Sequence, residues 1–193
     1  MRRALAIGLA ASLMVGVVAL PAAAGTGSKN ITEVVVSTDG FDVLTNLVVE
    51  AGLADDLAAV DGVTVFAPTS WAFRVLVKNV LIGQGMSARD AKDFAFKSDD
   101  TVISDAIIDM VGIAGVTDIL LYHVYGGGEV PASVAVTLDN APITMLNGGT
   151  LVVDGNGSGV RLKTTGPGSA RVKVADVMAS NGIIHVINRV LLP

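Results

Sequence analysis

The spacing of hydrophobic residues predicts a mainly helical first half of the chain. Phe41, Leu44 and Val48 recur at three- and four-residue intervals, which places them on one side of a helix. Asp39 precedes this helix as a candidate N-terminal cap, and Gly52 follows its end. The same kind of spacing predicts further helices over residues 53–60, 71–82, 87–96, 102–110 and 115–124.

Short polar residues mark where several of these helices begin. Ser87, followed three residues later by Asp90, is a candidate capping box, and Asp99 or Asp100 is a candidate cap for the helix after it. Likewise, hydroxyls at 69 and 70 are expected to cap the helix over 71–82.

A buried strand is predicted just before that helix. Val63 to Ala67 is a β-branched and aromatic run between Gly62 and Pro68. The helix itself is expected to be largely buried, because Trp71, Val75, Val80 and their neighbours are mostly hydrophobic.

After three consecutive glycines at 126–128, short β-rich runs replace the helical pattern. We expect strands over residues 130–137, 143–146, 150–153, 160–164, 171–178 and 183–192. The segments 147–149 (NGG) and 154–157 (DGNG) are hairpin signals between them. A helical half followed by a strand-rich half predicts an α+β domain.

The N-terminus has the layout of a cleavable secretory signal. Arg2 and Arg3 precede an uninterrupted hydrophobic run from Ala4 to Leu20, and the small residues Ala22 and Ala24 follow. The run is shorter than the roughly 18 to 20 residues of a spanning helix, which favours cleavage over a retained anchor. We therefore expect a signal peptide over residues 1–24, a flexible lead over 25–30 and one domain over 31–193.

Charge and cysteine content narrow the function. Removing the signal changes the net charge from −5 to −7, and the remaining Lys and Arg are scattered along the sequence. An acidic chain without a basic stripe argues against nucleic-acid binding and docking on anionic lipid. The absence of cysteine excludes disulfides, thiol catalysis and cysteine-ligated metal. We expect an exported, periplasmic or extracellular protein that does not span a membrane.

Three segments, in order, resemble the fasciclin family. They are TVFAPTSWAF (64–73), like the family's first box, LLYHV (120–124), like its Tyr-His motif, and NGIIHVINRVLLP (181–193), like its second box. The resemblance implies a wedge-shaped β-sandwich with helices packed along one edge. It gives structural motif positions to Thr64, Phe66, Pro68, Thr69 and His185.

The chain also departs from the family pattern. Ser70 stands where the first box usually has Asn or Asp, and Asn188 stands where the second box usually has Asp. The stretch from 83 to 115 is longer than the usual spacer.

The resemblance implies a candidate partner-binding surface at Asp118, Ile119, Tyr122 and His123, because the family's adhesive surface has been placed around the Tyr-His motif and nearby Asp-Ile pairs. Ile119 and Tyr122 suit a core equally well. His123 and His185 are interpreted as hydrogen-bonded structural residues, since two histidines without clustered carboxylates are too few metal ligands.

The sequence gives no signal for catalysis or a cofactor. It has no Gly-x-Ser-x-Gly elbow, no calcium-loop spacing and no phosphate-binding glycine motif in a strand-to-helix context. We therefore expect no enzyme, no metal and no cofactor. Asn30 and Asn156 match the N-glycosylation pattern, and the bacterial-type signal favours both being unmodified.

Two functions fit these observations. The first is an exported, non-catalytic binding or adhesion module that contacts a protein, a cell-surface component or extracellular matrix. The alternative is a carrier of an apolar small ligand, since some exported fasciclin-type proteins of algae bind carotenoids. Phe94, Phe96, Ile107 and Met110 would then line an apolar groove.

The signal-peptide hypothesis predicts that the mature protein begins at Gly25. Intact-mass spectrometry of exported material should give the mass of residues 25–193. A mass that includes the first 24 residues would contradict cleavage.

Overall fold

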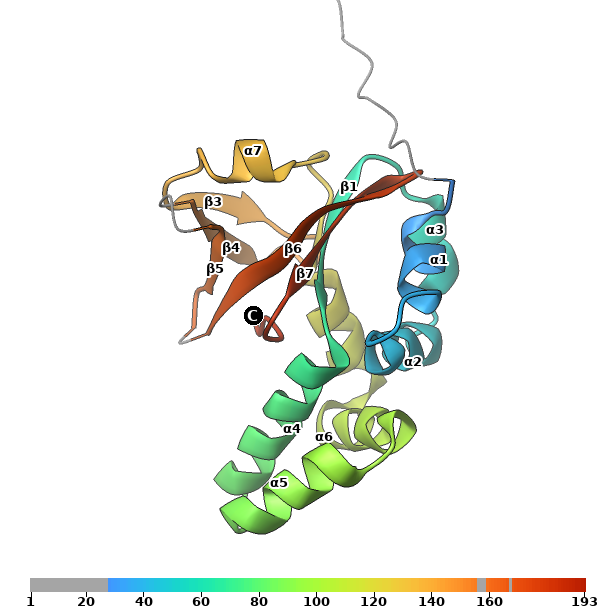
Figure 1. Cartoon of the computed structure of the whole chain (residues 1–193), viewed down its shortest axis with the longest axis vertical. Coiled ribbons are helices and arrows are strands. Elements are labelled where there is room, and N and C mark those ends of the chain that lie inside the picture. The colour runs from blue at the N-terminus through green and yellow to red at the C-terminus, as the bar shows by residue number, and fades with distance from the viewer. Residues whose placement is uncertain (1–27, 156–158, 167) are drawn as a thin grey trace, which may run out of the picture.

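The computed structural model describes residues 28–155, 159–166 and 168–193. The expected signal peptide and the glycosylation pattern at Asn156 lie outside these ranges. The described chain forms a strongly bent sheet with helices along one side, and a helical arm extends from its lower end (Figure 1). None of the helices in this part of the chain has the length and apolarity needed to cross a bilayer.

Seven helices and seven strands make up the described fold. The helices are α1 (Ile31–Val36), α2 (Asp42–Glu50), α3 (Ala54–Ala59), α4 (Ser70–Gly83), α5 (Ala88–Lys97), α6 (Asp100–Leu121) and α7 (Ala132–Ala135). The strands are β1 (Val63–Pro68), β2 (Val124–Tyr125), β3 (Ala141–Thr144), β4 (Thr150–Asp154), β5 (Arg161–Thr164), β6 (Ser169–Ala179) and β7 (Gly182–Ile187). The predicted α+β class is confirmed.

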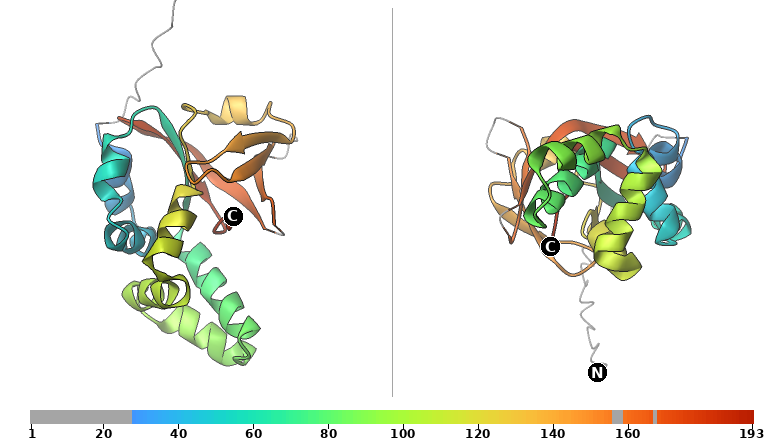
Figure 2. Two further views of the ribbon diagram at one scale, coloured as in Figure 1. Left: turned by 180° about the vertical axis from the view of Figure 1, so that it is seen from behind. Right: turned by 90° about the horizontal axis from the view of Figure 1, so that it is seen from below.

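The strands form one sheet in the order β2-β1-β7-β6-β5-β4-β3, in which only β1 and β7 are parallel neighbours. The long strand β6 joins its two halves, because residues 169–171 pair with β5 and residues from Val172 onward pair with β7. Two register shifts follow Val172 in β6. Such bulges bend a strand, and the sheet accordingly folds back on itself (Figure 2).

The central strands β1 and β7 separate two hydrophobic cores. Successive side chains of a strand point to opposite faces, so Val63, Val65 and Ala67 pack against the helices while Phe66 points into the bend of the sheet. All six residues of β1 are buried for this reason. The helical core includes Leu47, Phe73, Ile103 and Ile184, and the second core includes Tyr122, Leu151, Leu162 and Ile187.

Helix starts differ in part from the predictions. Thr69 caps α4 as expected, its hydroxyl accepting from the Ala72 N–H at 3.3 Å. Ser70 does not cap α4; its hydroxyl accepts from the Val43 N–H of α2 at 3.2 Å. Asp39 is not the cap of α2, whose first flanking residue is Phe41 without a side-chain cap. Ser70 of α4 therefore supplies the hydrogen-bond acceptor at the start of α2, where α2 has no side-chain cap of its own.

Helix α6 replaces two predicted helices. They are divided at Gly112, where φ is +71° and ψ is 166°, and not at Gly115 as predicted. Glycine reaches this left-handed φ without strain. The helix ends at Leu121, so Val124, predicted as helical, lies in β2.

One helix was missed and three further expectations were wrong. Residues 31–36 form α1, which begins with an Asn30–Glu33 capping box and was not predicted. A strand was expected over 130–137, where the chain instead forms the short helix α7. The last strand ends at Ile187 and not at 192. Trp71 is 62% exposed and packs against Phe96 across the arm, with ring centroids 4.5 Å apart and ring planes tilted by 48°, so α4 is not largely buried.

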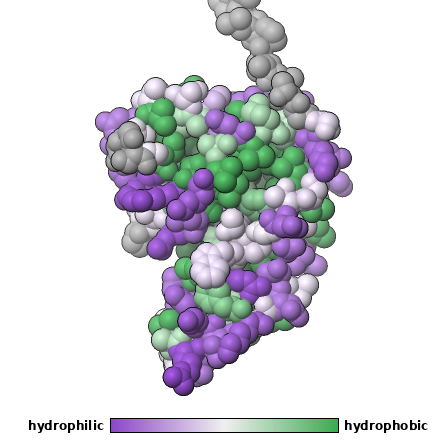
Figure 3. All heavy atoms as spheres, in the orientation of Figure 1, coloured by the Kyte–Doolittle hydropathy of each residue, from purple (hydrophilic) through white to green (hydrophobic). Residues whose placement is uncertain are grey.

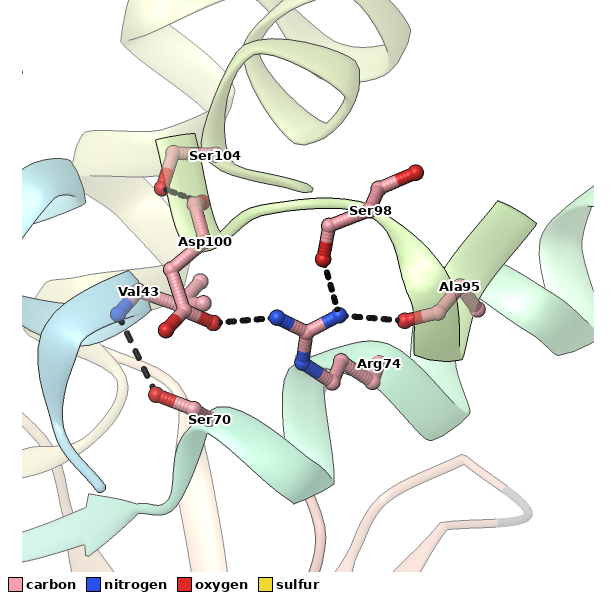
Figure 4. Close-up of polar contacts among 7 residues, drawn as sticks. All are labelled: Val43, Ser70, Arg74, Ala95, Ser98, Asp100 and Ser104. Carbon is pink, nitrogen blue, oxygen red and sulfur yellow. Dashed lines mark hydrogen bonds and ion pairs between the residues drawn. The ribbon is translucent and has the colours of Figure 1, made fainter. Parts of the chain in front are cut away.

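Arg74 joins the helices of the arm, as Figure 4 shows. Its guanidinium donates to the carbonyl oxygens of Ala95 at 2.6 Å and Ser98 at 2.8 Å, near the C-terminal end of α5. It also donates to the Asp100 carboxylate at 2.6 Å, at the start of α6. The guanidinium thus satisfies carbonyls that a helix end leaves free and fixes α4 relative to both neighbours.

Arg74→Ala should lower the free energy of unfolding by about 2 kcal/mol, because it leaves two carbonyls and a partly buried carboxylate without their donor. The matched control is Lys97→Ala, which removes an exposed pair with Asp93 and should cost about 0.5 kcal/mol or less. Urea unfolding of both variants measures the difference, and equal losses would contradict the bridging role of Arg74.

Candidate functional site

The four candidate residues, Asp118, Ile119, Tyr122 and His123, lie at the C-terminal end of α6 and directly after it. They differ in how far their side chains are exposed. Asp118 is exposed and its carboxylate accepts from the Asn147 side-chain amide at 3.1 Å, across to the β3–β4 hairpin. Ile119 is half-buried. Tyr122 and His123 are buried, at 0% and 3% exposed, so the structure does not offer them as direct contacts. Of the four candidate residues, only Asp118 and Ile119 therefore expose side-chain surface.

Tyr122 anchors the end of α6 to the hairpin. Its hydroxyl donates to the Thr150 carbonyl at 2.7 Å, and burial raises the pKa of this phenol above its usual value. The ring lies so close to Gly149 that a Cβ there would approach it to 2.8 Å. This hairpin position therefore accepts only glycine while Tyr122 stays in place.

His123 joins the same helix end to the C-terminal segment. Its Nε2 accepts from the Leu191 N–H at 2.9 Å, so Nδ1 carries the hydrogen and donates to the Ile119 carbonyl at 2.7 Å. Burial lowers the pKa of His123 to about 4, although the bond to the Ile119 carbonyl opposes this shift. The imidazole is therefore neutral in one fixed tautomer near pH 7.

Thr64 and His185, from the two family boxes, hold the segment after β2. The Thr64 hydroxyl donates to the Gly128 carbonyl and accepts from the Val130 N–H, both at 2.8 Å. His185 Nδ1 accepts from the Asp176 N–H at 3.3 Å, so its Nε2–H donates to the Val130 carbonyl at 2.8 Å. The imidazole also stacks on Phe66, with ring centroids 5.7 Å apart.

The two boxes meet through backbone pairing. Residues Val63 to Pro68 lie in register with Gly182 to Ile187 along the parallel strands. Asn188, at a departure from the family pattern, bonds instead to β6, where its side-chain oxygen accepts from the Arg171 N–H at 2.8 Å. The backbone ladder thus joins the boxes, and Ser70 and Asn188 each bond to another element.

Sequence reasoning missed Asn181. Its side-chain oxygen accepts from the Ile31 N–H at 2.9 Å, and its amide donates to the carbonyls of Leu57 and Val60, each at 2.9 Å. One buried amide therefore connects α1 and the end of α3 to the start of β7. The Asn-Gly dipeptide marks a turn, but these partners lie more than 120 residues away in the sequence.

The polar side chains described above are engaged in hydrogen bonds within the fold. Both histidines use both ring nitrogens on backbone partners, so neither is positioned as a base for a nucleophile. Within the described ranges, no three His, Asp or Glu side chains gather as metal ligands. Every buried side-chain nitrogen or oxygen in these ranges has a hydrogen-bond partner.

One apolar hollow of the described chain, of about 280 Å³, is lined by Val34, Val174 and Val177 among others, and two further hollows are small. One of about 40 Å³ lies between α1, α2 and β1, and another of about 20 Å³ lies inside the bend of the sheet. Small-molecule sites usually hold about 300 to 1,000 Å³. The side chains proposed for a carrier groove are used in packing. Phe94, Ile107 and Met110 belong to or contact the helical core, and Phe96 packs against Trp71 with its ring tilted.

Comparison with known proteins identifies the class. The model of the fasciclin domain matches residues 39–193, and the chain belongs to the fasciclin family. It is 30% identical over 171 residues to protein sll1483 of Synechocystis sp., covering 89% of this chain and 77% of that protein. It is also 25% identical over 173 residues to mouse stabilin-1, where the match covers 90% of this chain but 6% of stabilin-1.

A solved structure supports the same fold. The chain resembles a FAS1 domain pair from the insect cell adhesion molecule fasciclin I, with a TM-score of 0.62 at 15% identity. The match covers 86% of this chain and 52% of the other. The resemblance predicted from the three sequence segments is thereby confirmed.

The neutral state of His123 predicts a pH-dependent loss of stability. Its folded pKa of about 4 lies below the ordinary 6.5, so the unfolded chain binds the proton more readily. The contribution is complete above pH 6.5 and is lost as the pH falls towards 4, by up to about 3 kcal/mol. His123→Asn should remove this part of the pH dependence, measured by urea unfolding between pH 7.5 and 4.

Carboxylates titrate equally in both proteins, so the difference between the two pH profiles reports His123. Should the variant not fold, an NMR titration of the parent protein gives the same answer. A His123 imidazole that protonates near pH 6.5 in the folded protein would contradict the assignment.

Proposed function

We propose that the mature protein is an exported, non-catalytic binding module that contacts a cell-surface or extracellular-matrix component. The observation that carries the proposal is the use of the motif side chains. Thr64, His123, Asn181 and His185 each bond to backbone groups of distant segments. Because these four motif side chains are used to hold the fold together, we expect binding to take place through the surface of the domain.

The candidate contact surface is the end of α6. The hydrogen bonds of Tyr122 to Thr150 and of His123 to Leu191 fix this helix end to the rest of the domain. Asp118 and Ile119 are therefore held in a fixed position at the surface. A preorganised surface loses less conformational entropy when a partner binds. Asp118 contributes a charge and Ile119 a half-buried apolar side chain, which together suit a protein partner.

A second surface feature also supports a protein partner. Figure 3 shows hydrophobic side chains gathered over the face of β6 and β7. Val174 is 52% exposed there, beside a hollow of about 280 Å³ that Val34, Val177 and Val186 line. Contiguous exposed apolar surface of this kind often marks a site of interaction.

The comparisons favour adhesion over the carrier alternative. The structural neighbour is described as part of a cell adhesion molecule. The residues proposed to hold an apolar ligand are instead packed into the arm and the helical core.

Asp118→Ala tests the proposed surface. Cells of the producing organism should attach less well to the immobilised variant than to the parent, because the variant lacks the exposed charge. The melting temperature should change little, since the only described bond of the Asp118 side chain is to the Asn147 side chain at the surface.

Asp109→Ala is the matched control, because Asp109 is an exposed aspartate on the same helix. Equal attachment by the parent and both variants would remove the end of α6 from the binding surface. Equal loss in the two variants would indicate a general charge effect in place of a specific contact.

A further inference from the structure

Basic residues that are scattered in the sequence gather in one groove of the folded protein. The groove has a volume of about 570 Å³ and lies between α4 and the strands β5 and β6. Arg161, Arg171, Lys173 and Arg189 line it, and none of the described lining residues is acidic. Cations that are scattered along the sequence are therefore close together in the folded protein.

This gathering runs against the overall charge. The full chain has 18 acidic and 13 basic residues, and two of the basic residues lie in the signal segment. All 18 acidic residues fall within the described ranges, yet none forms an ion pair with any of the four groove cations. The three ion pairs of the described chain involve Arg74, Lys97 and Lys163 instead.

The register of the strands adds a local cost. Arg161 of β5 lies directly opposite Arg171 of β6, and like charges at such positions destabilise a sheet. Asp154 lies opposite Arg161 on its other side, but its carboxylate contacts the Lys163 ammonium at 2.8 Å. A bound anion between the two guanidinium groups would reverse the repulsion.

The other lining groups indicate what kind of anion fits. Asn79, Ser169 and Asn188 supply amides and a hydroxyl, which bond well to sugar hydroxyls, and Val75 and Leu76 of α4 supply an apolar wall for the face of a sugar ring. Guanidinium groups bind carboxylate or sulfate in a bidentate manner. None of the described residues that line the groove is aromatic, whereas single-stranded nucleic acid is bound by stacking on aromatics.

We propose that this groove binds an acidic polysaccharide through its carboxylate or sulfate groups. The net negative charge of the rest of the protein opposes docking on an anionic bilayer. A polysaccharide chain in the groove interacts chiefly with the local cations, because salt screens charges beyond about 10 Å. The site is separate from Asp118, so this proposal stands or falls independently of the adhesive surface.

Fluorescence anisotropy with labelled oligogalacturonate tests the groove. The mature protein should bind this probe with an affinity that falls as the salt concentration rises, and should not bind neutral oligomaltose of the same length. Arg161→Gln combined with Arg171→Gln should weaken binding about tenfold or more. The probe should also raise the melting temperature of the parent protein.

Arg89→Gln combined with Lys92→Gln is the matched control, because it removes the same charge from exposed positions of α5. It should leave affinity within about twofold, since these charges lie outside the groove. Should the groove variant not fold, Lys173→Gln combined with Arg189→Gln takes its place, because both residues are exposed.

Three outcomes would overturn the proposal. They are no binding of either oligogalacturonate or dextran sulfate at low salt, equal losses in the groove and control variants, and tighter binding to phosphatidylglycerol vesicles or oligo-dT than to the acidic saccharides. None of these outcomes bears on attachment through Asp118, which the cell assay measures.

Discussion

The parallel pairing of β1 with β7 joins residues 63–68 to residues 182–187 and divides the hydrophobic interior in two. One face of the pair receives the helices and the other faces the bend of the sheet. The same pair also fixes the segment after β2, because Thr64 from one strand and His185 from the other both bond to Val130. Val130 lies just before α7, and Leu191, which follows β7, bonds to His123 just after α6. The β1–β7 pair thus helps to position one end of each of these helices.

The two histidines show how the fold uses titratable groups. His123 carries its hydrogen on Nδ1 and His185 carries it on Nε2, and in each case a backbone N–H donates to the other nitrogen. Both rings therefore connect backbone groups, one to the C-terminal segment and one to Val130. These hydrogen bonds are sufficient to explain why both histidines lie in family motifs.

Much of the fold was predictable because its signals are local. The Asn-Gly-Gly turn and the alternating runs gave the β3–β4 pair, and three motif segments gave the family. Helix α1 was missed although Asn30 and Glu33 form a visible capping pattern, since the surrounding residues look like a flexible lead. Helix α7 was missed because Val134 and Val136 favour strands, while Pro131 and the Asp176 bond to the Ala132 N–H favour a turn of helix.

The candidate site was less predictable, because exposure depends on distant partners. Asp118 and Tyr122 are four residues apart, a spacing that would place them on one face of a continuous helix, but the helix ends at Leu121 and Tyr122 turns into the core. The basic groove could not be read from the sequence, since it requires the register that sets Arg161 against Arg171 and the return of the chain at Arg189.

The late position of β7 in the chain has a consequence for folding. The buried strand β1 precedes β7 by more than 100 residues and cannot complete its ladder until residues 182–187 are available, and such non-local pairing slows folding. Until then its hydrophobic edge is open to other chains, which is the usual origin of aggregation. A protein shortened before Gly182 would lack this pairing and would expose the edge of β1 even with every helix intact.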